Sequence, residues 1–401
     1  MQTAILDKYK NTAAGQEAES ILRKCVHCGF CTATCPTYQL LGDELDGPRG
    51  RIYQIKQVLE GQSDGVAARV HLDRCLTCRS CETTCPSGVE YGRLVDIGRK
   101  IVEPVAPRPW RERLIRTGLG YFLSSRNRAG ILFAMARWFR PILPVSLANK
   151  VPPRQKPIAF SKSSHPRKML LLEGCVQPAL TPATNQAARQ VLDRLGITLE
   201  SIKAAGCCGA LNHHLSQEEQ ARAHVRRNID AWWPRINNDV EAIVVSATGC
   251  GVMIKDYGYF MQDDQDYAAK AEKVSSSCRD LSEVVIENFD PEKFPTSTRR
   301  IAFHTPCTYQ HGLRLNGKVE EILTLLGYEL NVVRDSHMCC GSAGTYSILQ
   351  SELSSKLLDK KIENLLAGAP ELIVTANVGC QTHLMSAAEI PVQHWIELLA
   401  E

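Results

Sequence analysis

The chain has 401 residues, a formal net charge of +4 and 17 cysteines. Its 44% hydrophobic and 22% charged residues are typical of a globular protein of two or three domains, and they exclude a disordered, collagen-like or coiled-coil chain. Cysteine makes up about 4% of the residues, below the roughly 8–10% that marks small disulfide-stabilised domains. A chain of this length buries enough core to fold without disulfides, so its cysteines indicate metal or redox chemistry.

The first twenty residues are polar and lack the apolar segment of a secretory signal peptide. No stretch approaches the roughly 18 uninterrupted apolar residues of a membrane span. We therefore expect a cytoplasmic protein, whose thiols stay reduced and available to metals.

Two cysteine motifs near the N-terminus, CVHCGFCTATCP and CLTCRSCETTCP, have the C-x₂-C-x₂-C-x₃-C-P spacing of bacterial ferredoxins. In paired motifs of this kind the fourth cysteine ligates the partner cluster. Zinc is the alternative, but zinc sites use two pairs of cysteines rather than two runs of three. The predicted ligands are Cys25, Cys28, Cys31 and Cys85 for one [4Fe–4S] cluster, and Cys75, Cys78, Cys81 and Cys35 for a second.

The segments around these motifs have helical patterns. ESILRK leads into Cys25, and apolar residues recur at helical spacing between the motifs, at Ile52, Ile55, Val58 and Leu59. We therefore predict an α-helical ferredoxin domain with two clusters over residues 1–105.

Residues 106–168 form a predicted connector that is basic and rich in proline. It holds fourteen Lys or Arg against one acid, Glu112, whereas the rest of the chain holds 33 bases and 42 acids. This composition suits contact with another subunit or with an anionic membrane surface; nucleic acid is a third alternative, but no groove-reading motif accompanies the charge. An amphipathic helix is predicted by the shared face of Ile131, Leu132, Met135, Trp138 and Phe139.

The C-terminal half contains a duplication built around two Cys-Cys-Gly (CCG) triplets. The copies are offset by 132 residues at their first three cysteines and by 130 at the last. We predict a first CCG module over residues 169–296 and a second over 297–401. The repeated cysteines are Cys175, Cys207, Cys208 and Cys250 in the first module, and Cys307, Cys339, Cys340 and Cys380 in the second.

Each module alternates predicted strands and helices, so the fold class is α/β with an N-terminal α-helical ferredoxin domain. Because the repeated cysteines follow predicted strands, they lie where open α/β sheets bind ligands. We expect one or two further Fe–S clusters in the modules; the alternatives are a catalytic dithiol or buried structural thiols. Cys278 lies outside the repeat. Strands are predicted at 169–172, 242–245, 301–303 and 372–375, and helices near 188–195, 217–233, 319–326 and 348–366.

The order of these parts resembles the family of heterodisulfide reductase subunits and iron–sulfur subunits of quinone-linked dehydrogenases. The stretch CVHCGFCTATCPTYQLLGDELDGPRGRIYQIKQVLEG, with CLTCRSCETTCPSGV, is similar to bacterial glycolate oxidase iron–sulfur subunits. The resemblance implies a hetero-oligomer in which FAD-binding partner subunits oxidise glycolate to glyoxylate. This chain would relay the electrons to a quinone at the inner face of the cell membrane, and it would hold no catalytic residue for substrate oxidation.

Two departures from the family pattern bear on this interpretation. Heterodisulfide reductase relatives end each module in C-x₂-C, whereas here the last position is Met253 or His383. A thiol/disulfide enzyme is therefore a weaker alternative, and so is the same relay in a lactate or glycerol 3-phosphate dehydrogenase complex. No G-x-G-x-x-G follows a predicted strand, which favours a relay over a dinucleotide-dependent catalyst.

Overall fold

The structure is a computed structural model that describes residues 1–142, 151, 153, 155 and 163–401. The remaining residues of the predicted connector lie outside the described part of the chain. The chain divides into two compact units. Unit 1 comprises residues 1–116 and 337–361, and unit 2 comprises residues 117–336 and 362–401. The predicted domain boundaries do not coincide with these units and stay predictions.

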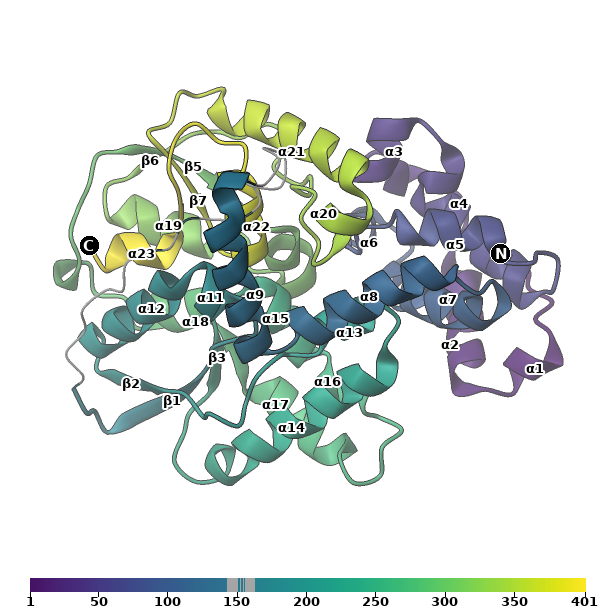
Figure 1. The fold of residues 1–401 in the computed structure, drawn as a ribbon, viewed down its shortest axis with the longest axis horizontal. Coiled ribbons are helices and arrows are strands. Elements are labelled where there is room, and N and C mark those ends of the chain that lie inside the picture. The colour runs from purple at the N-terminus through teal and green to yellow at the C-terminus, as the bar shows by residue number, and fades with distance from the viewer. Residues whose placement is uncertain (143–150, 152, 154, 156–162) are drawn as a thin grey trace. The chain divides into compact units, whose positions relative to one another are not determined.

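The N-terminal part of unit 1 is helical, as the apolar spacing predicted (Figure 1). The faces of α2, α4, α5 and α7 pack into one core, in which Ile21, Ile55 and Leu94 are almost completely buried. Gly98 of α7 lies so close to Ile55 that a Cβ there would meet its side chain at 2.7 Å. The elements are α1 (Asp7–Lys10), α2 (Ala13–Lys24), η1 (Phe30–Thr32), α3 (Pro36–Leu41), η2 (Glu44–Asp46), α4 (Pro48–Leu59), α5 (Val66–Asp73), α6 (Ser80–Thr84) and α7 (Tyr91–Val105).

Two helices occupy the first half of the predicted connector: α8 (Trp110–Leu123), followed by α9 (Arg126–Phe139) and the short η3 (Arg140–Ile142). The helix expected around Ile131 is confirmed as α9, whereas α8 was not predicted. Among the described residues, no helix combines the length and the hydropathy needed to cross a membrane.

Unit 2 contains two four-stranded parallel sheets, one for each copy of the repeat. Their strand orders, β2-β1-β3-β4 and β6-β5-β7-β8, are the same, so the sequence duplication is a structural one. The first sheet is formed by β1 (Arg167–Leu172), β2 (Ile197–Glu200), β3 (Ile243–Val245) and β4 (Cys278–Asp280). The second is formed by β5 (Arg300–His304), β6 (Glu329–Leu330), β7 (Leu372–Thr375) and β8 (Val392–His394).

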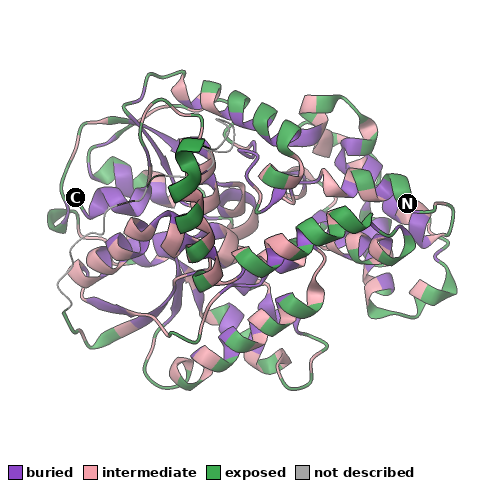
Figure 2. Cartoon of the chain, viewed as in Figure 1, coloured by how far each residue is buried: buried purple, intermediate pink, exposed green. Residues whose placement is uncertain are grey.

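Helices cover the sheets, whose central strands are buried (Figure 2). Parallel strands need long crossovers, which these helices supply. One core joins apolar residues of both sheets, including Val244 and Val374, with those of α12, α18, α19 and α23. A second core, around Trp232, fills the other face of the first sheet. The helices are α11 (Gln177–Leu180), α12 (Pro182–Arg194), α13 (Ala210–His214), α14 (Glu218–Ile236), α15 (Thr248–Lys255), α16 (Tyr257–Phe260), α17 (Ala268–Ser277), α18 (Leu281–Glu287), α19 (Lys318–Leu325), α22 (Val378–Met385) and α23 (Trp395–Leu399), with short turns η4 (Pro291–Lys293) and η5 (Thr308–Leu313).

The structure corrects the predicted elements in two respects. The single helix expected near 348–366 is two helices, α20 (Tyr346–Leu349) and α21 (Ser351–Leu366). The outer strands β2, β4, β6 and β8 were not predicted, because two to four residues carry too little periodicity to be recognised. Cys278 begins one of these strands, β4, and is fully buried there.

Helix α19 offers a matched test of the shared core. Leu323 is fully buried, whereas Leu325 of the same helix is 54% exposed. We expect Leu323→Ala to cost about 2–5 kcal/mol through lost burial and the cavity it leaves, and Leu325→Ala to cost about 0.5 kcal/mol or less. Thermal unfolding followed by circular dichroism measures both. Equal melting temperatures of the two variants would contradict this account of the core.

Candidate metal centres

The first pocket of unit 1 is lined by the four cysteines predicted to hold one cluster. Its walls include Cys25, Cys28, Cys31 and Cys85, and Cys81 contributes as well. The pocket has a volume of about 420 Å³, which includes open solvent at its mouth. Helix α2 ends immediately before Cys25, and α6 ends immediately before Cys85, so two helix ends deliver these thiols.

The second pocket is lined by the other predicted set. Cys35, Cys75, Cys78 and Cys81 lie on its walls, and its volume is about 300 Å³ with open solvent included. Cys81 lines both pockets, which therefore adjoin within unit 1. The fourth cysteine of each motif lines the pocket of the other motif, as expected for paired ferredoxin motifs.

The two cysteine loops repeat an unusual backbone conformation fifty residues apart. His27 and Gly29 of the first loop have φ values of 56° and 86°, and Thr77 and Arg79 of the second have 52° and 59°. Left-handed backbone is unfavourable for the three non-glycine residues, and such strain concentrates at functional sites. The left-handed residues turn each loop so that its successive cysteines line one pocket.

Two donors lie close to the Cys75 thiol of the second pocket. The backbone N–H of Thr77 donates to Cys75 Sγ at 3.4 Å, and the Tyr91 hydroxyl lies 3.6 Å from the same sulfur. Donors at this distance stabilise negative charge on sulfur, as a metal-bound thiolate requires.

Two other thiols of these pockets, Cys31 and Cys81, are unfavourable as free thiolates. Burial raises the pKa of the Cys31 thiol to about 11 and raises the pKa of Cys81 well above its ordinary value. A metal must therefore displace protons from several adjacent thiols. Soft thiolate ligands such as these suit Fe–S clusters, so both pockets fit [4Fe–4S] clusters.

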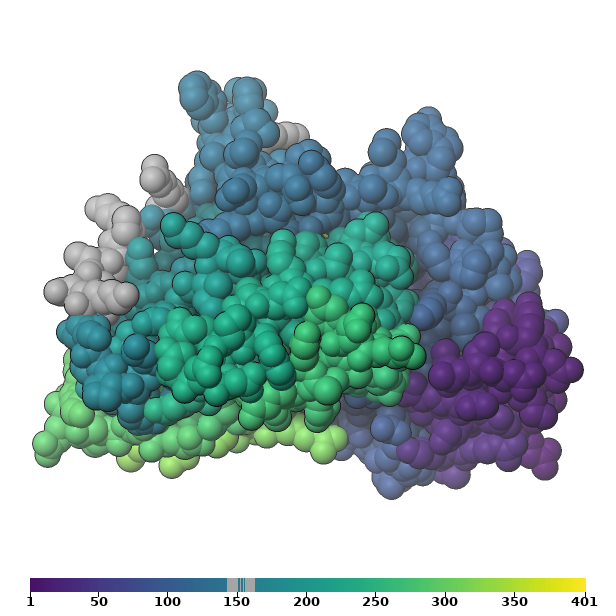
Figure 3. Space-filling view, turned by 90° about the horizontal axis from the view of Figure 1, so that it is seen from below, coloured from purple at the N-terminus to yellow at the C-terminus, as the bar shows by residue number. Residues whose placement is uncertain are grey.

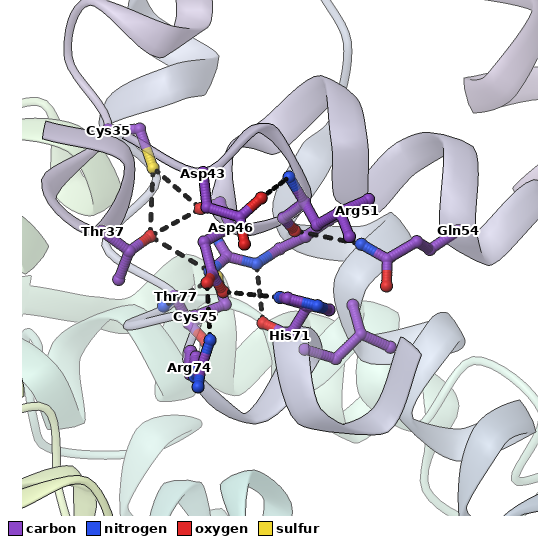
Figure 4. A network of polar contacts seen from close by, with 12 residues as sticks. Cys35, Thr37, Asp43, Asp46, Arg51, Gln54, His71, Arg74, Cys75 and Thr77 are labelled. Carbon is purple, nitrogen blue, oxygen red and sulfur yellow. Dashed lines mark hydrogen bonds and ion pairs between the residues drawn. The ribbon is translucent and has the colours of Figure 1, made fainter. Parts of the chain in front are cut away.

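Sequence reasoning missed the polar residues behind the second pocket. Arg51 lines this pocket and is 1% exposed, and Asp46 beneath it is fully buried (Figure 4). The segment GPRGR, directly before the apolar helical pattern of α4, was the one available signal. The sequence alone could not show that an arginine of this segment lines the pocket, because that depends on where α4 packs in the folded chain.

The four cysteines of the first CCG module also lie together, in unit 2. Cys175 follows β1 and Cys250 follows β3, at the switch point where neighbouring parallel strands connect in opposite directions. The thiols of Cys175 and Cys208 donate hydrogen bonds to Cys207, and these bonds lower the pKa of Cys207 well below its ordinary value. Cys208 is also hydrogen-bonded to Cys250, so the four sulfurs form one connected group that fits a metal or cluster.

A buried polar pair supports the Cys-Cys turn of this module. The Tyr257 hydroxyl donates to the Cys208 carbonyl at 2.8 Å, and Asn228 Nδ2 donates to the Cys207 carbonyl at 2.9 Å. The N–H of Gly209 donates to Cys207 Sγ at 3.4 Å. The second module has the same turn, in which Gly341 N–H donates to Cys339 Sγ at 3.4 Å.

The cysteines of the second module are divided between the compact units. Cys339 and Cys340 belong to unit 1, whereas Cys307 and Cys380 belong to unit 2, after β5 and at the start of α22. In unit 2 the ligand atoms of Cys380 and His304 lie within 4.8 Å of each other. Convergence of all four thiols in this module stays a prediction.

Two protein-family models match the regions that contain these cysteines. A 4Fe-4S dicluster domain matches residues 21–89, and a cysteine-rich domain matches residues 169–255 and 301–385. Over 402 aligned residues the chain is 51% identical to the glycolate oxidase iron-sulfur subunit of Escherichia coli (strain K12), covering the whole of this chain and 99% of that one. The chain belongs to the family of glycolate oxidase iron–sulfur subunits. As a member, it is an Fe–S protein with a role in electron transfer.

Two further relatives are less similar to this chain. The probable glycolate oxidase iron-sulfur subunit of Bacillus subtilis (strain 168) is 30% identical over 90% of this chain and 88% of its own. Lactate utilization protein A of Bacillus velezensis is 27% identical over 53% of this chain and 88% of its own.

The glycine after the first Cys-Cys pair gives a test of this turn. Gly209 has φ +94°, and a Cβ there would lie 3.1 Å from the Ala221 carbonyl oxygen, whereas Gly196 has φ +77° with nothing within 4 Å. Gly196→Ala is expected to cost about 1–2 kcal/mol, from left-handed strain alone. Gly209→Ala adds a steric contact and is expected to cost more. The melting temperatures of the two variants measure this difference. A Gly209→Ala protein as stable as Gly196→Ala would refute the close approach of position 209 to the Ala221 carbonyl oxygen.

Proposed function

We propose that this chain is the electron-transfer subunit of a quinone-linked glycolate dehydrogenase complex. In this proposal, FAD-containing partner subunits oxidise glycolate, and the chain conducts the electrons to a membrane quinone. The observation that carries the proposal is the pair of adjoining thiol-lined pockets in unit 1. The names of the two full-length relatives support glycolate as the substrate.

The stoichiometry requires a relay that handles single electrons. Oxidation of glycolate to glyoxylate releases two electrons and two protons, and reduction of a quinone to a quinol takes up the same numbers. When bound, [4Fe–4S] clusters supply one-electron redox chemistry over a range of roughly −700 to +450 mV.

In this proposal the protein holds both clusters by cysteine ligands, buries most ligands of the second site, and leaves one edge of the first site open to a partner. We assign Cys25, Cys28, Cys31 and Cys85 to the first site and Cys75, Cys78, Cys81 and Cys35 to the second. In the first set Cys28 is exposed, whereas Cys35, Cys75 and Cys81 of the second set are buried. The exposed edge beside Cys28 would serve electron exchange with a partner. Apolar Val26 and Phe30, 67% and 61% exposed, flank this edge.

The first CCG module would hold a further cluster on Cys175, Cys207, Cys208 and Cys250. The connected sulfur group in unit 2 supports this assignment. For the second module we propose Cys307, Cys339, Cys340 and Cys380 on the basis of the duplication. A thiol/disulfide enzyme is disfavoured, because Met253 and His383 stand where its relatives carry the last cysteine.

Lactate is the second candidate fuel. The relatives named lactate utilization protein A support it, but they align with only about half of this chain. The native complex, purified anaerobically and assayed with a quinone analogue, should turn over glycolate faster than lactate or glycerol 3-phosphate. Turnover of lactate alone would overturn glycolate as the substrate and leave the relay intact.

Cys28→Ser tests the relay itself. We expect this variant to lose one cluster's complement of iron and sulfide, and the complex to lose glycolate-driven reduction of the quinone analogue. Cys278→Ala is the control, because Cys278 lies in strand β4 outside both motifs, and it should keep both properties. Full quinone reduction by Cys28→Ser would refute the role of the first site.

We further propose that α9 binds an anionic membrane surface. Ile131, Met135 and Trp138 recur at helical spacing and are 62%, 50% and 82% exposed, and α9 projects from the surface (Figure 3). The connector around it carries fourteen basic residues and one acid. Each base near an anionic leaflet contributes about 1 kcal/mol, so a few engaged charges suffice for peripheral binding.

Co-sedimentation with vesicles measures this contact. The chain should bind vesicles containing anionic phosphatidylglycerol and not vesicles of phosphatidylcholine alone, and Ile131→Glu with Trp138→Glu should abolish binding. Leu325→Glu, at an exposed apolar residue of α19, is the control and should bind normally. Unchanged binding by the double variant would instead favour α9 as a contact with another subunit.

A further inference from the structure

A buried arginine lies directly behind the second pocket. Arg51, on α4, is 1% exposed and lines the pocket together with Cys35 and Cys75. Its Nε donates to the His71 carbonyl at 2.7 Å, and its Nη2 donates to Thr37 Oγ1 at 3.1 Å and to Asp46 Oδ1 at 3.2 Å (Figure 4). The guanidinium is thus held on three sides, which fixes its charge in place.

The countercharge of Arg51 is shared with other residues. Asp46 is fully buried, and it also accepts from Arg74 Nη1 at 2.8 Å and pairs with His71 Nδ1 at 2.9 Å. Asp43 lies close to the same group, and its side chain accepts from the Leu45 N–H. Asp46 is shared between two guanidinium groups, and solvent screens the exposed Asp43, so these carboxylates offset only part of the positive charge that Arg51 presents to the pocket.

The first pocket has a different arrangement. Its arginine, Arg49, is 35% exposed and forms a two-point pair with the side chain of Glu44. Solvent screens such a pair, and its carboxylate is not shared with a second arginine in the described contacts. A buried charge acts through a lower dielectric and is therefore felt more strongly.

We propose that Arg51 is a positioning residue whose buried charge raises the reduction potential of the cluster held in the second pocket. Reduction adds one negative charge to a cluster, and a fixed cation nearby stabilises the reduced form. Asp46 acts with opposite sign and limits the shift. The inference rests on the proposed ligand assignment of the second pocket, which iron and sulfide content tests separately.

The test is an anaerobic redox titration of the full chain with its clusters, followed by electron paramagnetic resonance. Arg51→Gln should shift the midpoint potential of one ferredoxin-type cluster to more negative values and leave the other unchanged. Arg51→Lys keeps the charge and should stay close to the unaltered protein. Asp46→Asn should shift the same cluster in the opposite direction, which a purely structural role would not produce.

Two further variants complete the design. Arg23→Gln removes a 61% exposed arginine of α2 and should change neither potential. Arg74→Gln, at a residue that is 35% exposed, covers the case in which Arg51→Gln or Asp46→Asn loses iron. The Arg74→Gln variant leaves the negative charge of Asp46 less neutralised. It should therefore lower the potential of the cluster in the second pocket, by a smaller amount than Arg51→Gln does.

The outcomes separate the inference from the assignment beneath it. Arg51→Gln with full iron content and unchanged potentials would overturn the inference, and so would equal shifts in Arg51→Gln and Arg51→Lys. If Arg51→Gln loses iron, an unchanged potential in Arg74→Gln overturns it instead. Full iron and sulfide in a Cys75→Ser chain would refute the ligand assignment itself.

Discussion

The structure of unit 1 depends on one constraint, the crowding of thiols that are unfavourable as free anions. Eight cysteines line two adjoining pockets, and burial raises the pKa of thiols such as Cys31 and Cys81. Such a group is stable either fully protonated or around a cation that replaces the protons. Left-handed loop residues and the ends of α2 and α6 hold the sulfurs close together. The helical core therefore holds together a set of mostly buried or half-buried thiols that can lose their protons only to a metal.

The CCG modules gather cysteines by a different geometry. In a parallel sheet all carboxyl ends lie at one edge, so residues that follow β1 and β3 meet although 75 positions separate Cys175 from Cys250. The Cys-Cys-Gly turn adds two sulfurs from a third loop, and Asn228 and Tyr257 fix its carbonyls. Both sheets have the same strand order, so each copy of the repeat contains an equivalent carboxyl edge of its sheet.

Charge is distributed as unevenly as cysteine. The modest total of +4 combines a strongly basic connector with an acidic remainder. Arg126 and Arg140, at the two ends of α9, are exposed, whereas the buried Arg51 lines the second pocket. In the two proposals made above, burial decides the role of an arginine, because it removes the screening of its charge by solvent.

The sequence by itself determined the two cysteine motifs, the duplication and helices such as α4, α9 and α14, because these depend on spacing within short segments. It also indicated the central strands, whose apolar runs are local. Only the tertiary structure decided that Arg51 and Asp46 stand behind the second pocket, that β2, β4, β6 and β8 complete the sheets, and that the second module's cysteines belong to different compact units. Those features arise from contacts between segments far apart in the chain, which no local pattern encodes.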